Sequence, residues 1–275
     1  MMQVSVHGHE LYAYTGGKPF NPAQPTIVLI HGVLNDHSVW ALQSRHLAHH
    51  GWNVLAIDLP GHSRSKGTAP ASVEEAAEAI IALLDALGIE RAALAGHSWG
   101  SLIALEAASR LGTRVSHLIL IGTAAPMKVS PALLEMSQNA PEKAMHLVNV
   151  FSRNTLAAPP SGLGPGTWVY GLGMALNRRV LRSNPHENVF HKGFTACDRY
   201  SDAATAITQV KAPVLFILGT HDQMTPAKSG QALARIAQDA GVSVRVEQLN
   251  VGHNLMTEAP EETLKAIHAG LNAAA

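Results

Sequence analysis

The residues with the clearest chemical meaning lie at positions 96–100, which read Gly-His-Ser-Trp-Gly. A short apolar run precedes them at 92–95, and helix-forming residues follow at 101–108. A Gly-x-Ser-x-Gly between a strand and a helix presents the serine hydroxyl at the tip of a sharp turn, which the flanking glycines permit. The start of the helix directs backbone N–H groups at negative charge that develops beside that oxygen. We therefore predict that Ser98 is a nucleophile.

A serine hydroxyl is a poor nucleophile near neutral pH and needs an adjacent base. Two later residues stand where a base and its orienting acid are expected, because Asp222 follows the apolar run 213–218 and His253 follows 242–249. Catalytic residues of open parallel sheets lie beyond the carboxyl ends of the strands. Other aspartates compete for the role of the acid, but none follows a late strand as well: Asp58, Asp198 and Asp202.

The elements that must position these residues alternate between strands and helices. Continuous apolar runs at 26–30, 54–58, 92–95, 118–121 and 213–218 are typical of strands buried on both faces. Their alternation with helical segments predicts an α/β fold with a parallel sheet and helices on both faces. An initial hairpin (3–6 and 10–14) and an edge strand (242–249) bring the sheet to eight strands.

The alternation breaks between residues 126 and 210, where no buried strand pattern occurs. This stretch predicts a helical insertion, interrupted by a loop rich in proline and glycine at 157–166. We expect a core domain formed by 1–125 and 211–275 and a cap formed by 126–210, whose large apolar side chains contribute to a pocket.

Two helix starts have local signals. Ser72 and Glu75 form a capping box for the helix that follows, and Thr225 and Pro226 fit the N-cap and first residue of another.

Composition excludes several classes of partner. Lys plus Arg and Asp plus Glu both number 20, which argues against a nucleic-acid or acidic-lipid partner. The single cysteine, Cys197, cannot form an internal disulfide, and neither a secretory signal nor an apolar run of bilayer length is visible. We expect a cytoplasmic protein without a membrane partner, either a monomer or a homodimer.

Metal and cofactor patterns are weak. The pair His7 and His9 has no third ligand nearby, and the glycines of 162–166 lack dinucleotide spacing and follow no strand. We expect no metal, no cofactor and a small-molecule substrate.

Five motifs in order resemble the α/β-hydrolase superfamily, in the branch with a helical cap between the sixth and seventh strands. They are His31-Gly32, Asp58-x-Pro-Gly-His-Ser-x-Ser, Gly-His-Ser-Trp-Gly at 96–100, Gly219-x-x-Asp-x-x-x-Pro226 and Gly252-His253. The resemblance covers nearly the whole chain.

The resemblance implies roles for several residues. Ser98, Asp222 and His253 would form the catalytic triad, with His253 as the base. The backbone N–H groups of Trp99 and Val33 would form the oxyanion hole, Val33 because it follows His-Gly.

Other polar residues close to these motifs are expected to have supporting roles. His31 and His97 would brace the oxyanion loop and the elbow. For Asp36 and His37, a solvated loop is favoured over contact with substrate.

The reaction is expected to be hydrolysis of carboxylic esters with small to medium hydrophobic acyl or aryl groups. A serine at the elbow argues against dehalogenases and epoxide hydrolases, which resemble this fold but use aspartate there. A carbon–carbon bond or enol-lactone hydrolase is the alternative enzyme. A ligand-binding, receptor-like homologue with little turnover is the alternative of another class.

Overall fold

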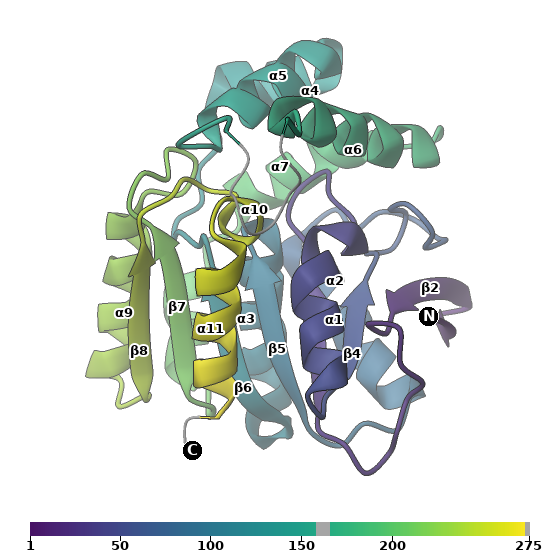
Figure 1. Cartoon of the computed structure of the whole chain (residues 1–275), viewed down its shortest axis with the longest axis vertical. Coiled ribbons are helices and arrows are strands. Elements are labelled where there is room, and N and C mark those ends of the chain that lie inside the picture. Colours follow the sequence, from purple (N-terminus) through teal and green to yellow (C-terminus); the bar gives the residue numbers. More distant parts are fainter. Residues whose placement is uncertain (158–165, 273–275) are drawn as a thin grey trace.

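The computed structural model describes residues 1–157 and 166–272, in which eight strands form one sheet (Figure 1). The order across the sheet is β1-β2-β4-β3-β5-β6-β7-β8. Only the pairs β1–β2 and β2–β4 are antiparallel, so the predicted mostly parallel, eight-stranded sheet is confirmed. The strands are β1 Met2–Val6, β2 His9–Tyr14, β3 Thr26–Ile30, β4 Asn53–Ile57, β5 Ala92–His97, β6 Val115–Ile121, β7 Val214–Gly219 and β8 Val244–Leu249.

Helices cover both faces of the sheet, as predicted. One face packs against α1 (Ala41–His49) and α11 (Pro260–Leu271). The other face packs against α2 (Val73–Ala86), α3 (Trp99–Leu111) and α9 (Ala227–Asp239). Every residue of β3, β4, β5 and β7 is buried, because these strands have helices on both sides. Three short elements complete the core: η1 His37–Trp40, η2 Gly112–Arg114 and α10 Leu255–Glu258.

The described residues between β6 and β7 form five helices, in the stretch where the sequence predicts a helical insertion. They are α4 Pro131–Asn139, α5 Pro141–Phe151, α6 Val169–Ser183, α7 Val189–Arg199 and α8 Ala203–Gln209. Figure 1 shows α4 to α7 above the carboxyl ends of the strands, and we call the segment from α4 to α8 the helical insertion. The expected Pro/Gly loop at 157–166 lies mostly outside the described residues.

The helical insertion has a small apolar core of its own, which includes Met145, Met174 and Phe190. Leu34, from the loop after β3, belongs to the same cluster and is almost fully buried. The insertion is therefore packed onto the loop that carries the expected oxyanion residue Val33.

The helix-start predictions had different outcomes. The prediction for Ser72 is confirmed, because Ser72 is the N-cap of α2 and its hydroxyl accepts a bond from the N–H of Glu75 (3.1 Å). The Glu75 carboxylate in turn accepts a bond from the N–H of Ala71 (2.8 Å). The prediction for Thr225 is wrong, because α9 begins at Ala227 with Pro226 at its N-cap. The described helices include none long and apolar enough to cross a membrane.

Candidate active site

Ser98 occupies the turn between β5 and α3 in a backbone conformation that favours glycine, with φ 54° and ψ −123°. Such a conformation costs roughly 1–3 kcal/mol and persists only where the surroundings enforce it. The surroundings here are two close backbone approaches. A Cβ atom on Gly96 would collide with the carbonyl of Gly100, and one on Gly100 would collide with the carbonyl of Ile30. The two glycines of the motif are thus required by the turn itself.

The loop after β3 lies against this turn. A Cβ atom on Gly32 would lie 3.2 Å from the Cβ of Ser98, which explains the glycine at that position. The His31 ring donates from Nδ1 to the carbonyl of Gly32 (2.8 Å) and accepts at Nε2 from the N–H of Leu59 (3.2 Å). His31 therefore holds the loop in place, as expected, and Val33 is the next residue of this loop after Gly32.

Asp222 and His253 come together although 31 residues separate them. Asp222 follows β7 and His253 follows β8, and these neighbouring strands end at the same edge of the sheet. His253 Nδ1 lies 2.8 Å from Asp222 Oδ2, and both residues are buried. Burial disfavours the charged form of Asp222, but attraction to His253 and hydrogen bonds from His253 and Thr225 outweigh it, so the pKa of Asp222 lies below its ordinary value.

Thr225 is part of this network, which the sequence did not predict. Its hydroxyl lies 2.6 Å from Asp222 Oδ2, 3.0 Å from His253 Nδ1 and 2.9 Å from the carbonyl oxygen of Gly122. Its backbone N–H donates to Asp222 Oδ1 (2.8 Å). The sequence signal was its spacing of three residues from Asp222, which favours such a bond and fits an N-cap equally well.

The backbone of His253 is held from two sides. The Nε2 of His97 donates to the carbonyl of His253 (2.8 Å), and the N–H of His253 donates to the carbonyl of Ser152 (2.8 Å). His97 thus connects the elbow to the loop of His253, a bracing role of the expected kind. Ser152 is the C-cap of α5, so the helical insertion directly contacts the loop of the expected base.

Ser98 and His253 line two cavities. The larger has a volume of about 550 Å³ and extends under α5 and α6. The smaller, of about 290 Å³, is lined mainly by apolar side chains, including Met127, Val129 and Leu133. Val33 lines both cavities, whereas the side chain of Trp99 is fully buried in the core and leaves its backbone N–H at the start of α3.

The architecture agrees with a family comparison, in which a model described as the alpha/beta hydrolase fold matches residues 25–260. The chain belongs to the α/β-hydrolase family. A structural comparison supports the assignment. The esterase EaEST from Exiguobacterium antarcticum has a TM-score of 0.82 at 17% identity, over 98% of this chain and 99% of that one, which is a likeness of fold.

Curated relatives of this α/β-hydrolase carry several activities. The chain is 29% identical over 224 residues to a 2-hydroxy-6-oxononadienedioate/2-hydroxy-6-oxononatrienedioate hydrolase of Paraburkholderia phymatum, covering 76% of this chain and 74% of the relative. It is 28% identical over 230 residues to a pimeloyl-[acyl-carrier protein] methyl ester esterase of Neisseria meningitidis, covering 79% and 83%. A 99-residue match, 40% identical, covers 36% of this chain but only 26% of the dihydrolipoyllysine-residue acetyltransferase component of the acetoin cleaving system of Pseudomonas putida. The names of the first two relatives, which the chain matches over most of their length, support a hydrolase.

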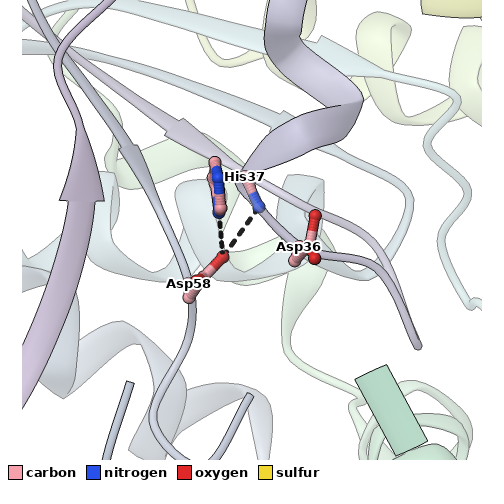
Figure 2. Close-up of side chains that lie close together, drawn as sticks. All are labelled: Asp36, His37 and Asp58. Carbon is pink, nitrogen blue, oxygen red and sulfur yellow. Dashed lines mark hydrogen bonds and ion pairs between the residues drawn. The ribbon is translucent and has the colours of Figure 1, made fainter. Parts of the chain in front are cut away.

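A second cluster of polar side chains in this α/β-hydrolase groups Asp36, His37 and Asp58, whose ligand atoms lie within 4.8 Å of one another. In Figure 2, Asp58 faces both the ring and the backbone nitrogen of His37, at 2.7 and 2.8 Å. Asp36 is paired with Arg179 of α6 at 2.7 Å. The oxygens are thus engaged by protein donors, and this cluster joins the loop after β3 to its surroundings.

The expectation that Asp36 and His37 belong to a solvated loop is therefore wrong for Asp36, which is fully buried, and only His37 keeps partial exposure. The sequence could not reveal the partner of Asp36, because Arg179 lies 143 residues away.

The three competing aspartates have other partners. Asp58 contacts His37, Asp198 accepts a bond from the N–H of Val129 (3.1 Å), and Asp202 accepts one from Ser201 (3.0 Å). Cys197 is buried, and burial raises the pKa of its thiol far above the ordinary value, which disfavours the reactive thiolate.

Proposed function

We propose that this α/β-hydrolase is a serine hydrolase that cleaves carboxylic esters through Ser98, His253 and Asp222. One observation carries the proposal: His253, buried and with its Nδ1 2.8 Å from Asp222 Oδ2, lines the same two cavities as Ser98. An imidazole whose Nδ1 is hydrogen-bonded to a carboxylate keeps Nε2 available as the base.

The proposed reaction proceeds in two halves. His253 removes the proton of Ser98 as the serine oxygen attacks the ester carbonyl, and the backbone N–H groups of Val33 and Trp99 stabilise the oxyanion. Each such donor is worth roughly 3 kcal/mol of barrier. The alkoxide leaves with the proton from His253, and a water activated by the same histidine then hydrolyses the acyl-enzyme.

The volumes of the two cavities suit substrates of limited size. We propose that the core, 1–125 and 211–275, holds the catalytic residues, and that the cap, 126–210, closes over them. The apolar side chains that line both cavities suit a small to medium acyl or aryl group.

The test is a panel of p-nitrophenyl esters from acetate to dodecanoate, run on the wild type and on Ser98→Ala. A chain-length optimum that disappears in the variant supports the proposal. A fluorophosphonate probe should label the wild type stoichiometrically and leave Ser98→Ala unlabelled. Failure of the wild type to label would reject an activated serine and leave the receptor-like alternative.

A second candidate, a carbon–carbon bond or enol-lactone hydrolase, is favoured by the match to the Paraburkholderia hydrolase over three quarters of the chain. It uses the same serine, histidine and aspartate. Probe labelling without turnover of any ester in the panel would favour this candidate.

A further inference from the structure

The charged side chains that line the larger cavity beside Ser98 are arginines. Among the described residues, its lining includes two arginines, Arg153 and Arg179, and no aspartate or glutamate. Arg179 already has a partner, since it forms the ion pair with Asp36. Arg153 takes part in none of the salt bridges formed by the described residues.

Arg153 lies close to the expected base. It follows Ser152, whose carbonyl accepts the N–H groups of both His253 and Asn254. Its Nη1 donates to the hydroxyl of Thr257 at 3.3 Å, on the segment that follows His253. These contacts place the guanidinium at the wall of the cavity, on the side of the catalytic loop.

Few of the hydrogen-bond donors of the Arg153 guanidinium have an acceptor among the described residues. Its Nε is buried without a hydrogen-bond partner in the described part of the chain. Burial lowers the pKa of Arg153, and the charge of Glu258 opposes that effect only in part. Glu258 accepts the N–H groups of Asn154 (2.8 Å) and Gly252 (3.4 Å) at Oε2, and its Oε1 is buried without a hydrogen-bond partner among the described residues. The charge of Glu258 therefore attracts Arg153, but its carboxylate accepts no hydrogen bond from the guanidinium. A guanidinium has five donors, and a buried cation is costly unless acceptors meet them.

We propose that Arg153 binds a carboxylate of the substrate, so that the preferred substrates are esters whose acyl chain ends in a carboxylate, such as monoesters of dicarboxylic acids. A carboxylate matches the planar fork of a guanidinium and can accept two of its hydrogen bonds at once. The apolar residues of the same cavity, Val148 and Leu176 among them, would contact the methylene chain. This inference rests on the proposed function, because it names the substrate class of the same site.

The turnover experiment compares matched substrates. Mono-p-nitrophenyl esters of glutaric, adipic and suberic acid are compared with the same esters whose distal carboxylate is capped as a methyl ester. We expect the wild type to prefer the free acid at least tenfold in kcat/KM for one or more chain lengths. Equal rates, or a preference for the capped ester at every length, would overturn the inference.

Variants test whether Arg153 causes the preference for the free acid. In Arg153→Met the ratio of the two kcat/KM values should fall tenfold or more, mainly through the KM of the free acid, and Arg153→Lys should retain part of it. The matched control is Arg182→Met, an exposed arginine of α6 outside the lining of this cavity, which should keep the wild-type ratio. An unchanged ratio in Arg153→Met would show that Arg153 is not the anchor.

A binding measurement separates this inference from the proposed function. Calorimetric titration of Ser98→Ala with adipate and with hexanoate requires no turnover. Tighter binding of adipate, lost when Arg153→Met is added, supports the carboxylate site even if no ester is cleaved. Equal binding of the two acids would reject the site, whereas absent ester hydrolysis and absent probe labelling would reject the proposed function.

Discussion

At the scale of the residue, the carboxylate of Asp222 accepts four hydrogen bonds: from the N–H groups of Met224 and Thr225, the hydroxyl of Thr225 and the ring of His253. Burial alone would favour the neutral acid, so these donors are what hold the group ionised. An ionised Asp222 fixes the tautomer of His253 and stabilises its charged form during the proposed reaction.

Asp222→Asn should lower kcat by roughly 10³–10⁴-fold, because an amide at this position favours the wrong tautomer of the histidine. The variant is measured with the best ester of the panel, with circular dichroism as the check of folding. Asp198→Asn is the control and should remain active. If Asp198→Asn were inactive and Asp222→Asn active, the acid would be misassigned.

Thr225→Val removes the hydroxyl and keeps the shape of the side chain. A hydrogen bond to a charged group contributes roughly 1.5–3 kcal/mol, so kcat should fall by about tenfold or more. Loss of this donor raises the pKa of Asp222 and weakens the network that orients the ring of His253. Thr225→Ser should restore kcat. A wild-type kcat in Thr225→Val would reduce Thr225 to a packing residue.

At the scale of the element, α6 is tied to the loop after β3 by Arg179 and Asp36, at 2.7 Å. The side chain of Asp36 is 1% exposed and that of Arg179 is 56% exposed, so the pair lies half in solvent. Asp36 also accepts bonds from the hydroxyls of Ser38 (2.6 Å) and Ser63 (3.2 Å). The carboxylate is thus the centre of the contact between helical insertion and core.

Asp36→Asn should lower the free energy of unfolding by about 1–3 kcal/mol, because it leaves buried donors poorly matched. Arg179→Met should cost less, since its guanidinium is largely exposed and screened. Urea denaturation of both single variants and the double variant gives the coupling between the two residues. Additive losses would show that the ion pair itself contributes nothing and that the serines hold Asp36.

At the scale of the whole molecule, several histidines are buried in the neutral form. Burial, with repulsion from neighbouring histidines, lowers the pKa of His62 and of His97 to about 3. The unfolded chain binds protons at these residues below the ordinary histidine pKa of about 6.5, whereas the folded chain does not. Acid therefore favours the unfolded state, and stability is lost as the pH falls from about 6.5 towards 3.

We expect each of these histidines to remove up to about 1.4 kcal/mol of unfolding free energy per pH unit in that window. Urea denaturation at pH 7.5, 6.0, 5.0 and 4.5 measures how steeply the free energy of unfolding changes with pH. His62→Gln should make this dependence on pH shallower. Constant stability from pH 7.5 to 4.5 would contradict neutral burial of His62 and His97.

The sequence by itself determined the fold and the positions of the expected catalytic residues. Apolar runs of strand length, with helical segments between them, are local patterns, and so is the glycine spacing around Ser98. Placing Asp222 and His253 after two late strands also sufficed to predict that they meet, because the carboxyl ends of parallel strands share one edge of the sheet. The same reasoning found the helical insertion but not its contacts.

Only the tertiary structure decided which side chains surround that edge. Thr225 reads equally well as a helix cap, and only the placement of β7 beside β8 brings His253 to the hydroxyl that also contacts Asp222. Arg179 meets Asp36 across 143 residues, and Ser152 and His253, which pair through their backbones, are also far apart along the chain. Such contacts depend on how the helical insertion packs on the core, and no pattern along the chain records that packing. The charge of the larger cavity, and with it the substrate class that we propose, follows from those contacts.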